Sequence, residues 1–404
     1  MRVLGREFAG YPILPVSGAL RSEAIALAKP QQESQARVFA GNDSFLQRPS
    51  MRPSNHSIEI FTPSFADEEN TNAQNLTVKE IVARLPPQLF RVTMLCHHKP
   101  DPRIAGRDNT QLVSYRQYGN TLRLLRRALF RPDIYFYPRN GPLDRAFFFL
   151  RKRLRLRTKV VAHIVMVMND ITARGMIARA ILEGDAVFAN SAFVGSTIQE
   201  RFGVKAATIF NGTDRRFFFP APDFAEVRQK NALVVLYAGS FQARKRVELV
   251  IQQAARLPHV LFRLVGRGET EPDCRALVER LGCKNVSFLG HRTPAQLGEE
   301  MRQADVFLFP SILEGHPQVL GQAAACALPA IAMNVYRPEY VVHSETGFLV
   351  ESDIDLSQKL DLLVENPALR RSMAVAATAH SRKFDWDRIA MRWAEVFREV
   401  AARR

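Results

Sequence analysis

Residues 304–329 read ADVFLFPSILEGHPQVLGQAAACALP, and this stretch indicates the fold. The apolar run Val306–Phe309 predicts a strand buried on both faces, as in a parallel sheet covered by helices. A Pro–Ser turn follows, then Glu314 and Gly315, then a small-residue helix over about Gln318–Cys326. Open α/β sheets bind phosphorylated ligands where a strand's carboxyl end meets a helix N-terminus. The stretch therefore predicts either a turn that binds phosphate and sugar or an ordinary strand–helix turn with a solvated Glu314.

Strand and helix patterns alternate through the rest of the chain, which predicts α/β architecture with parallel sheets. In the N-terminal half the predicted strands are Ile58–Phe61, Val92–Cys96, Ile134–Tyr137, Lys159–Met166 and Ala186–Ala189. A helix is predicted over 75–85, and a closing helix over 386–401 has an apolar face. At 404 residues the chain is long enough for two domains of ordinary size.

The composition narrows the class of protein. Hydrophobic residues make up 47% and charged residues 24%, as in a soluble globular protein. The four cysteines show no C-x-x-C spacing, which argues against a zinc site or a disulfide framework. No apolar run reaches the ~20 residues needed to span a bilayer. Residues 1–50 lack clear periodicity and are expected to be a disordered or non-native extension.

The sequence motif of residues 304–329 resembles the nucleotide-sugar site of retaining glycosyltransferases of family 4, which have the GT-B fold. The positions that match that pattern are Pro310, Ser311, Glu314, Gly315, Val319, Ala323, Ala325 and Pro329. Two positions depart from it, because Gln322 replaces the second glutamate of the family's pair and Ala327 replaces a glycine.

Residues 234–254 resemble the same family's strand–loop–helix that holds the donor diphosphate. Gly239 ends the strand and Lys245 stands at the family's lysine position. The usual arginine after the glycine is Ser240, and Arg244 or Arg246 could replace its phosphate contact. The resemblance covers residues from about 180 to 400 and is weaker over 56–180.

The resemblance implies two Rossmann-like domains facing a cleft, with a C-terminal helix that crosses back to the N-terminal domain. The implied boundaries are 51–215 for the acceptor-side domain, 216–384 for the nucleotide-sugar domain and 385–404 for the helix. The implied activity is a retaining transfer of sugar from a nucleotide-sugar donor to a glycan, lipid-carrier or lipid acceptor, in polysaccharide or glycolipid biosynthesis. The resemblance implies no cofactor and no required metal.

The donor chemistry assigns roles within this motif. Lys245 is expected to place a charge on the diphosphate, and Glu314 to bind a hydroxyl of the donor sugar as a catalytic residue. Gln322 is expected to meet the ribose without the charge of a glutamate. The other predicted donor-binding residues are Gly239, Ser240, Arg244, Gly315, His316, Gln318 and Val319.

The N-terminal half offers fewer candidates. His163 lies in a strand–loop segment where the family often has a functional histidine, and its alternative is a core histidine with satisfied hydrogen bonds. Asn70, Asn72 and Asn75 lie where the family's first loop approaches donor and acceptor, and the alternative for them is polar loop packing.

The formal net charge is +16, and basic residues cluster in RAFFFLRKRLRLRTK at 145–159. Phe147, Phe148, Phe149 and Leu150 could enter an acyl interface while the neighbouring cations meet anionic headgroups. Those cations are Arg151, Lys152, Arg153, Arg155 and Arg157. The pattern favours a protein of the cytoplasm that associates peripherally with the inner face of the membrane. A solvated helix is the alternative, and no nucleic-acid-binding motif accompanies the charge.

Two other functions remain open at this point. A non-catalytic family member acting as a membrane-associated scaffold would explain Ser240, Gln322 and Ala327. A nucleotide-sugar epimerase of the same fold would change its nucleotide sugar without any acceptor. Titration with UDP, GDP and ADP separates an intact site from a lost one.

Overall fold

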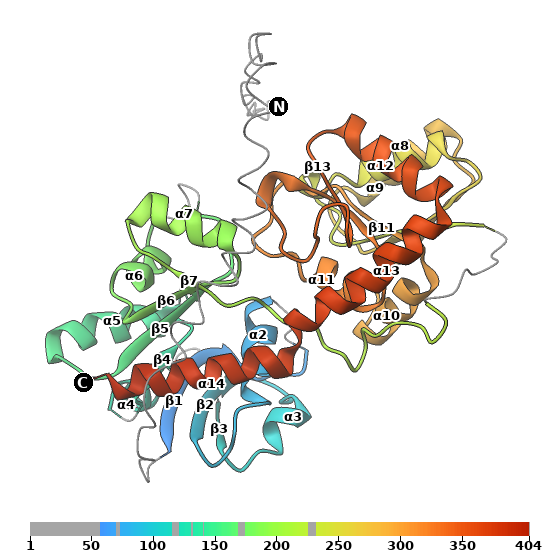
Figure 1. The fold of residues 1–404 in the computed structure, drawn as a ribbon. Coiled ribbons are helices and arrows are strands. Elements are labelled where there is room, and N and C mark those ends of the chain that lie inside the picture. Colours follow the sequence, from blue (N-terminus) through green and yellow to red (C-terminus); the bar gives the residue numbers. More distant parts are fainter. Residues whose placement is uncertain are drawn as a thin grey trace, which may run out of the picture. The chain divides into compact units, whose positions relative to one another are not determined.

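A computed structural model describes residues 57–69, 73–114, 121–130, 132–139, 141–168, 174–224 and 232–403. The extension predicted at 1–50 lies outside these residues. Helices and strands alternate along the chain in two parallel sheets (Figure 1). In the described part of the chain, no helix is both long and apolar enough to cross a membrane.

The first sheet has seven strands in the order β3-β2-β1-β4-β5-β6-β7, and every pairing is parallel. Its strands are β1 (Ile58–Phe65), β2 (Phe90–Cys96), β3 (Thr110–Ser114), β4 (Ile134–Phe136), β5 (Lys159–Ile164), β6 (Ala186–Ala189) and β7 (Ala207–Thr208). Its helices are α2 (Ala73–Val82), α3 (Pro102–Ala105), α4 (Thr121–Phe130), α5 (Pro142–Leu154), α6 (Met176–Leu182) and α7 (Ala192–Phe202). From β1 the chain first adds β2 and β3 on one side of the sheet and then returns to add β4 on the other side. The direction in which strands are added therefore reverses between β1 and β4.

Successive residues of these strands enter different cores, as strand geometry requires. Ile60 and Val161 face one core, and Phe61 and Ala162 face the other. Both faces of the sheet are therefore covered, which explains why its strands are continuously apolar rather than alternating.

The second sheet has six parallel strands in the order β10-β9-β8-β11-β12-β13. Its strands are β8 (Val234–Ala238), β9 (Leu261–Val265), β10 (Val286–Gly290), β11 (Val306–Phe309), β12 (Ala330–Met333) and β13 (Gly347–Val350). Its helices are α8 (Val247–Arg256), α9 (Glu271–Leu281), α10 (Pro294–Gln303), α11 (Gln318–Ala325), α12 (Asp353–Glu365) and α13 (Pro367–Ser381). Short 3₁₀ turns are η2 (Ala243–Lys245), η3 (Asn334–Tyr336) and η4 (Arg382–Phe384).

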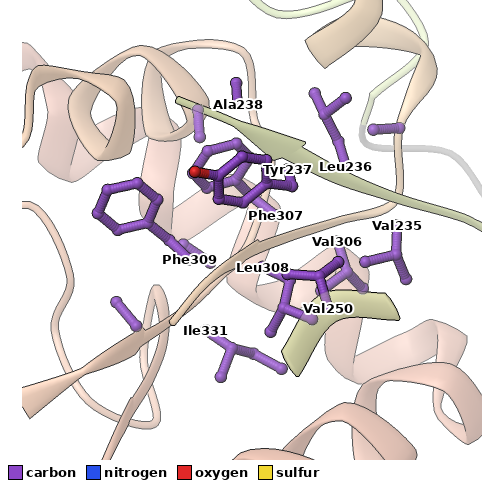
Figure 2. Close-up of a cluster of buried hydrophobic side chains, with 14 of the residues drawn as sticks. Val235, Leu236, Tyr237, Ala238, Val250, Val306, Phe307, Leu308, Phe309 and Ile331 are labelled. Atoms are coloured by element: carbon purple, nitrogen blue, oxygen red, sulfur yellow. The ribbon is translucent and has the colours of Figure 1, made fainter. Parts of the chain in front are cut away.

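The centre of the second sheet is a dense apolar core. Figure 2 shows β8 and β11 side by side, with Leu236, Phe307 and Leu308 among the side chains gathered between strands and helices. All four residues of β11 are fully buried. The strand predicted from the run Val306–Phe309 is confirmed with the same bounds.

The last helix, α14 (Trp386–Ala402), packs on the first sheet, although it follows the second sheet in the chain. Trp393 and Phe397 are fully buried in the same core as Phe136 of β4. Figure 1 shows α14 lying along the first sheet. The crossing helix predicted over 386–401 is therefore confirmed.

The predicted architecture agrees with the structure, and the differences are at the ends of elements. The strand predicted at 58–61 continues to Phe65, and the short strands β3 and β7 were not predicted. Thr110–Ser114 and Ala207–Thr208 form the two edges of the sheet, where their residues are less buried and the apolar pattern is weaker. The domain boundaries at 215 and 384 stay predictions.

Candidate functional site

The candidate site lies at the carboxyl ends of β8 and β11, where the strand order of the second sheet reverses. This is the position at which open α/β sheets bind ligands. A cavity of about 560 Å³ opens there. Its lining comprises Val165, Asn190, Asn211, Ala238, Gly239, Ser240, Lys245, Val265, Gly266, Arg267, His291, Arg292, Leu297, Glu314, Gly315, His316, Pro317, Gln318, Val319 and Gln322.

Glu314 and Lys245 form an ion pair inside this cavity. Lys245 Nζ lies 2.5 Å from Glu314 Oε1, and Ser311 Oγ donates to the same oxygen at 2.5 Å. Arg244 Nη1 donates to it as well, at 2.8 Å. Burial lowers the pKa of Lys245, while the negative charge of Glu314 acts in the opposite direction. The pair keeps a cation and a carboxylate together at the place where a diphosphate-sugar would need both.

The structure decides between the two arginines that could replace the family's missing contact at Ser240. Arg246 forms a surface ion pair with Asp353, away from the cavity. Arg244 instead reaches Glu314 and the carbonyl of Leu313. Arg244 is thus the arginine next to the predicted donor site, although it does not line the cavity itself.

Gly315 is required by close packing. A Cβ added there would lie 2.5 Å from the carbonyl oxygen of Val165, which follows β5. The Ser191 hydroxyl donates to the carbonyl of Gly315 at 2.8 Å. The turn after β11 is therefore held directly against the first sheet's strand ends.

Several buried polar atoms at the cavity have no hydrogen-bond partner among the described residues. They are Asn190 Oδ1, Gln318 Nε2 and both ring nitrogens of His316. Buried polar groups are normally paired, so unpaired ones that face a cavity fit a polar ligand. Gln318 is the first residue of α11, whose N-terminal N–H groups add donors for an anion.

Three basic lining residues were not predicted from the sequence, namely Arg267, His291 and Arg292. Arg267 follows Gly266, the residue directly after β9, and His291 and Arg292 follow Gly290, the last residue of β10. The signal was present, because both strands carry their carboxyl ends to the same edge as β8 and β11. In the described part of the chain, no cluster of three or more His, Cys, Asp or Glu side chains could hold a metal ion.

The catalytic role predicted for His163 does not fit its position. His163 shares a face of β5 with Val161, so its ring points toward α14 and not into the cavity. It packs edge-on against Tyr137 and Trp393, and Nε2 lies 3.2 Å from the carbonyl of Ile209. Burial lowers its pKa to about 3, so the ring is neutral at physiological pH. The core alternative describes this residue.

Asn75 is also a structural residue. Its side chain is buried, and Oδ1 accepts from the Phe65 N–H at 3.1 Å and from Arg139 at 3.0 Å. Asn75 therefore holds the carboxyl end of β1 and the loop after β4 together. Asn70 and Asn72, predicted beside it, lie outside the described residues.

The contacts of Asn75 reveal a cationic cluster that sequence reasoning missed. Arg139 is half-buried, and its guanidinium lies 5.8 Å from the centre of the Phe65 ring. His97 stacks on the same ring at 4.7 Å. Phe65, His97 and Arg139 come from the ends of β1, β2 and β4, which are neighbours in the sheet. Arg139 makes no ion pair with a carboxylate of any described residue.

The basic segment 145–159 is only partly a surface. Phe147 and Phe148 are fully buried in the core below α5, which corrects the expectation that they enter an acyl interface. Arg151 is bound to Asp185 and to two backbone carbonyls, so it fastens α5 to β6 and is not a free cation. Phe149 remains 60% exposed.

The exposed remainder forms what we call the α5 patch. It consists of Phe149, Lys152, Arg153, Leu154, Arg155, Arg157 and Leu182. It combines apolar and cationic side chains, and the carboxylate of Glu183 lies next to Lys152 and Arg155.

Comparison with known proteins bears directly on the second sheet. Residues 220–380 match the family of glycosyl transferases group 1. This segment contains the ion pair and most of the cavity lining. The part of the chain that holds the candidate site is therefore similar to the class of enzyme that the sequence predicted, the glycosyltransferases.

Curated relatives point the same way. An uncharacterized glycosyltransferase of Methanocaldococcus jannaschii is 24% identical over 240 residues, which are 59% of this chain and 66% of that protein. A D-inositol 3-phosphate glycosyltransferase of Streptomyces bingchenggensis is 28% identical over 241 residues, which are 54% of this chain and 53% of that one. The matches thus span between half and two thirds of the relatives' lengths.

Solved structures share the fold over more of the chain. The Anabaena protein HepE, crystallised with UDP and glucose, superposes with a TM-score of 0.69 and 19% identity, covering 85% of this chain and all of that one. Sucrose-phosphate synthase of Thermosynechococcus elongatus gives a TM-score of 0.66 at 19% identity, covering 85% of this chain and 99% of that one. The predicted GT-B fold, with two Rossmann-like domains, is confirmed.

Proposed function

We propose that this protein is a retaining glycosyltransferase of family 4 that moves a sugar from a nucleotide-sugar donor to a glycan, lipid-carrier or lipid acceptor. The observation that carries the proposal is the Lys245–Glu314 pair in a cavity at the strand-order reversal of the second sheet. The matched family and the UDP complexes of HepE support a nucleotide-sugar donor. Polysaccharide or glycolipid assembly is the proposed setting.

The pair provides both halves of donor activation. Lys245 has three N–H donors, so it can keep one on Glu314 and turn the others to a diphosphate. As the nucleoside diphosphate leaves, its growing negative charge is stabilised by Lys245 and by the N–H groups at the start of α11. The ionised Glu314 accepts a hydrogen bond from a hydroxyl of the sugar and orients it. These groups need no cofactor for the transfer.

Gln322 lies in the cavity lining, one turn of α11 beyond Gln318. Its Oε1 can accept from a ribose hydroxyl, but as a neutral acceptor it binds more weakly than a carboxylate. We propose that Gln322 lowers donor affinity without abolishing it. This distinguishes an active enzyme from a scaffold, whose site would bind no nucleotide.

Calorimetric titration with UDP, GDP and ADP tests the function. We expect one of them to bind the wild-type protein, and Lys245→Ala to weaken that binding by tenfold or more. The matched control is Lys284→Ala, because Lys284 is an exposed lysine of the same sheet region. Absence of binding for all three nucleotides would favour the scaffold. Conversion of a nucleotide sugar without acceptor would favour an epimerase.

The acceptor side is proposed to recognise an anionic group. Arg139 is a partly desolvated cation whose guanidinium hydrogen bonds to the neutral amide of Asn75 and contacts the ring of Phe65. Burial lowers the pKa of Arg139, while the charge of Asp144 acts in the opposite direction without forming a direct ion pair with the guanidinium. A partly buried cation without an ion pair is stabilised when a phosphate or carboxylate ligand hydrogen bonds to it. One relative takes its name from a phosphorylated acceptor, D-inositol 3-phosphate.

We further propose peripheral association with an anionic membrane surface on the cytoplasmic side, through the α5 patch. Each cation near such a surface contributes about 1 kcal/mol, and Phe149 and Leu154 add apolar burial. Replacing Lys152, Arg153, Arg155 and Arg157 by Gln should release the protein from anionic vesicles in a sedimentation assay. The matched control replaces four exposed cations elsewhere, Arg280, Lys284, Arg388 and Arg398. Equal sedimentation of both variants with anionic vesicles would contradict the proposal.

A further inference from the structure

The first turn of α7 holds the second sheet's loops at two points. We call residues 314–317 the donor loop. The Ser191 hydroxyl donates to the carbonyl of Gly315 in that loop at 2.8 Å. The Ala192 N–H donates to Glu339 Oε1 at 2.7 Å. Ser191 is the N-cap of α7 and Ala192 its first residue, so one helix end of the first sheet contacts both the donor loop and Glu339.

The other oxygen of Glu339 points to the donor loop. Glu339 Oε2 has no hydrogen-bond partner among the described residues and lies 3.7 Å from His316 Nε2. Both ring nitrogens of His316 are also without a partner, and its side chain is completely buried. A movement of a few tenths of an ångström would bring the two atoms within hydrogen-bond distance.

Aromatic packing fixes the plane of the histidine ring. His316 stacks on Phe210 with centroids 5.4 Å apart and contacts the ring of Tyr340 at 4.0 Å. The Tyr340 hydroxyl donates to the carbonyl of Asn211 at 2.9 Å. The ring can therefore meet Glu339 without turning, and movement of His316 moves the donor loop.

We propose that Glu339 is a positioning residue for the donor loop. Its carboxyl group bridges the N-terminus of α7 and His316, and so sets the placement of Gly315 and Glu314 for the nucleotide sugar. This inference rests on the proposed function. Glu339 acts through His316 and does not line the cavity itself.

The bridge is complete when Glu339 carries a proton. The protonated carboxyl accepts from Ala192 with one oxygen and donates to the neutral His316 Nε2 with the other. The ionised form buries a net negative charge, which costs free energy, and Oε2 can then accept only from the His316 tautomer that carries its proton on Nε2. Burial accordingly raises the pKa of Glu339 to about 7, and burial, with a smaller effect of His163, lowers the pKa of His316 to about 3.

Other groups face Glu339 without titrating in its place. His380 of α13 lies with Nε2 2.8 Å from the Glu339 carbonyl, and burial lowers its pKa. Burial raises the pKa of Tyr340 well above its ordinary range. Because the pKa of Glu339 in the folded protein lies above its unfolded value, the stabilisation by the protonated carboxyl group is fully present below about pH 4.5. It is lost progressively as the pH rises through about 7.

The test compares the wild type with Glu339→Gln, Glu339→Ala and His316→Phe, with Glu345→Gln as an exposed glutamate control nearby. Gln at 339 reproduces the protonated form at every pH, and Phe at 316 keeps the ring stacking without a nitrogen. Thermal unfolding is followed from pH 5.5 to 8.5. Binding of the nucleoside diphosphate that the wild type accepts is titrated at pH 6 and pH 8. Variants are compared at equal pH, because the nucleotide's own phosphate also titrates.

We expect Glu339→Gln to match the wild type at pH 6 and to bind the nucleotide about threefold to tenfold more tightly than the wild type at pH 8. Glu339→Ala and His316→Phe should bind more weakly than the wild type at pH 6, and Glu345→Gln should follow the wild type throughout. Unfolding of Glu339→Gln should also lose part of the wild type's decline toward high pH.

The proposal is overturned if Glu339→Gln keeps the wild type's pH dependence in unfolding, or if Glu339→Ala binds nucleotide like the wild type at pH 6. A pH-dependent bridge in unfolding, combined with no nucleotide binding by the wild type, overturns the proposed function and with it the role at the donor loop.

Discussion

The two sheets have the same strand order around their first strand, yet the cations at their carboxyl edges are paired differently. At the second sheet, Lys245 and Arg244 already share the carboxylate of Glu314. At the first sheet, Arg139 rests on an aromatic ring and an amide without a carboxylate partner among the described residues. The two cations at the second sheet are tied to a carboxylate at the predicted donor site, whereas the guanidinium of Arg139 at the first sheet has no such direct ion pair. We expect the first kind of edge to do chemistry and the second to select a partner.

Glu314→Gln should have the largest effect on this contrast. The substitution removes the negative charge of the group to which Lys245, Arg244 and Ser311 all donate hydrogen bonds. It also removes the charged acceptor proposed for the sugar hydroxyl. The expected loss is about 10²–10³ in rate, as for removal of one preorganised polar contact. Release of nucleoside diphosphate at saturating nucleotide sugar measures it, with the exposed Glu365→Gln as control. A nearly normal rate would remove Glu314 from the mechanism.

His163→Ala should separate a core role from a catalytic role. The ring fills space between Tyr137 and Trp393 and approaches the Ile209 carbonyl. Its removal should lower the free energy of unfolding by about 2–4 kcal/mol, as for other large-to-small core substitutions. The rate per folded molecule should stay within about twofold, since the ring of His163 points into the core and does not line the cavity. A hundredfold rate loss with unchanged urea denaturation would restore the catalytic assignment.

The two sheets also differ in how far their sites could be predicted from the sequence. In the second sheet, Glu314, Gly315 and Lys245 follow strand ends closely, so local patterns and the family resemblance placed them together. In the first sheet, Phe65, His97 and Arg139 are separated by tens of residues, and their contact depends on which strands are neighbours. His163 was misplaced because a one-residue change of strand face moves a side chain from the cavity edge to the core. Glu339 could not have been found from sequence, because its contact with Ala192 joins two distant loops.

Arg139→Gln should have an intermediate effect that is confined to the acceptor side. We expect binding of a phosphorylated acceptor to weaken by about tenfold, the scale of one charged hydrogen bond, while nucleotide binding is unchanged. Calorimetry with D-inositol 3-phosphate and with unphosphorylated inositol measures the difference, both on protein saturated with the nucleoside diphosphate that the wild type binds. Arg91→Gln is the control, since Arg91 is exposed on β2. If both ligands bind equally to the wild type, Arg139 has a structural role and does not bind an anion.

Ala327→Gly should have the smallest effect, and it should stabilise the protein where the other substitutions weaken stability or function. Ala327 follows α11 with a φ of 59°, in the left-handed region where a Cβ is strained and glycine is favoured. The Leu328 N–H returns to the Ala323 carbonyl at 3.0 Å, so the backbone there is fixed by the helix end and cannot relax. Replacing the methyl group should therefore stabilise the protein by about 0.5–1 kcal/mol, after the larger unfolded-state entropy of glycine is subtracted.

The matched control is Ala276→Gly, at an exposed position inside α9. There the same change should destabilise the protein by about 1 kcal/mol, since the backbone is helical and the methyl group is unstrained. Urea denaturation of both variants measures the change in the free energy of unfolding, which should be positive for Ala327→Gly and negative for Ala276→Gly. Because Ala327 lies beyond the cavity lining, nucleotide affinity should not change in either variant. Destabilisation by Ala327→Gly would show that the alanine's packing outweighs its backbone strain, and that the family's glycine has been replaced at no cost to this helix end.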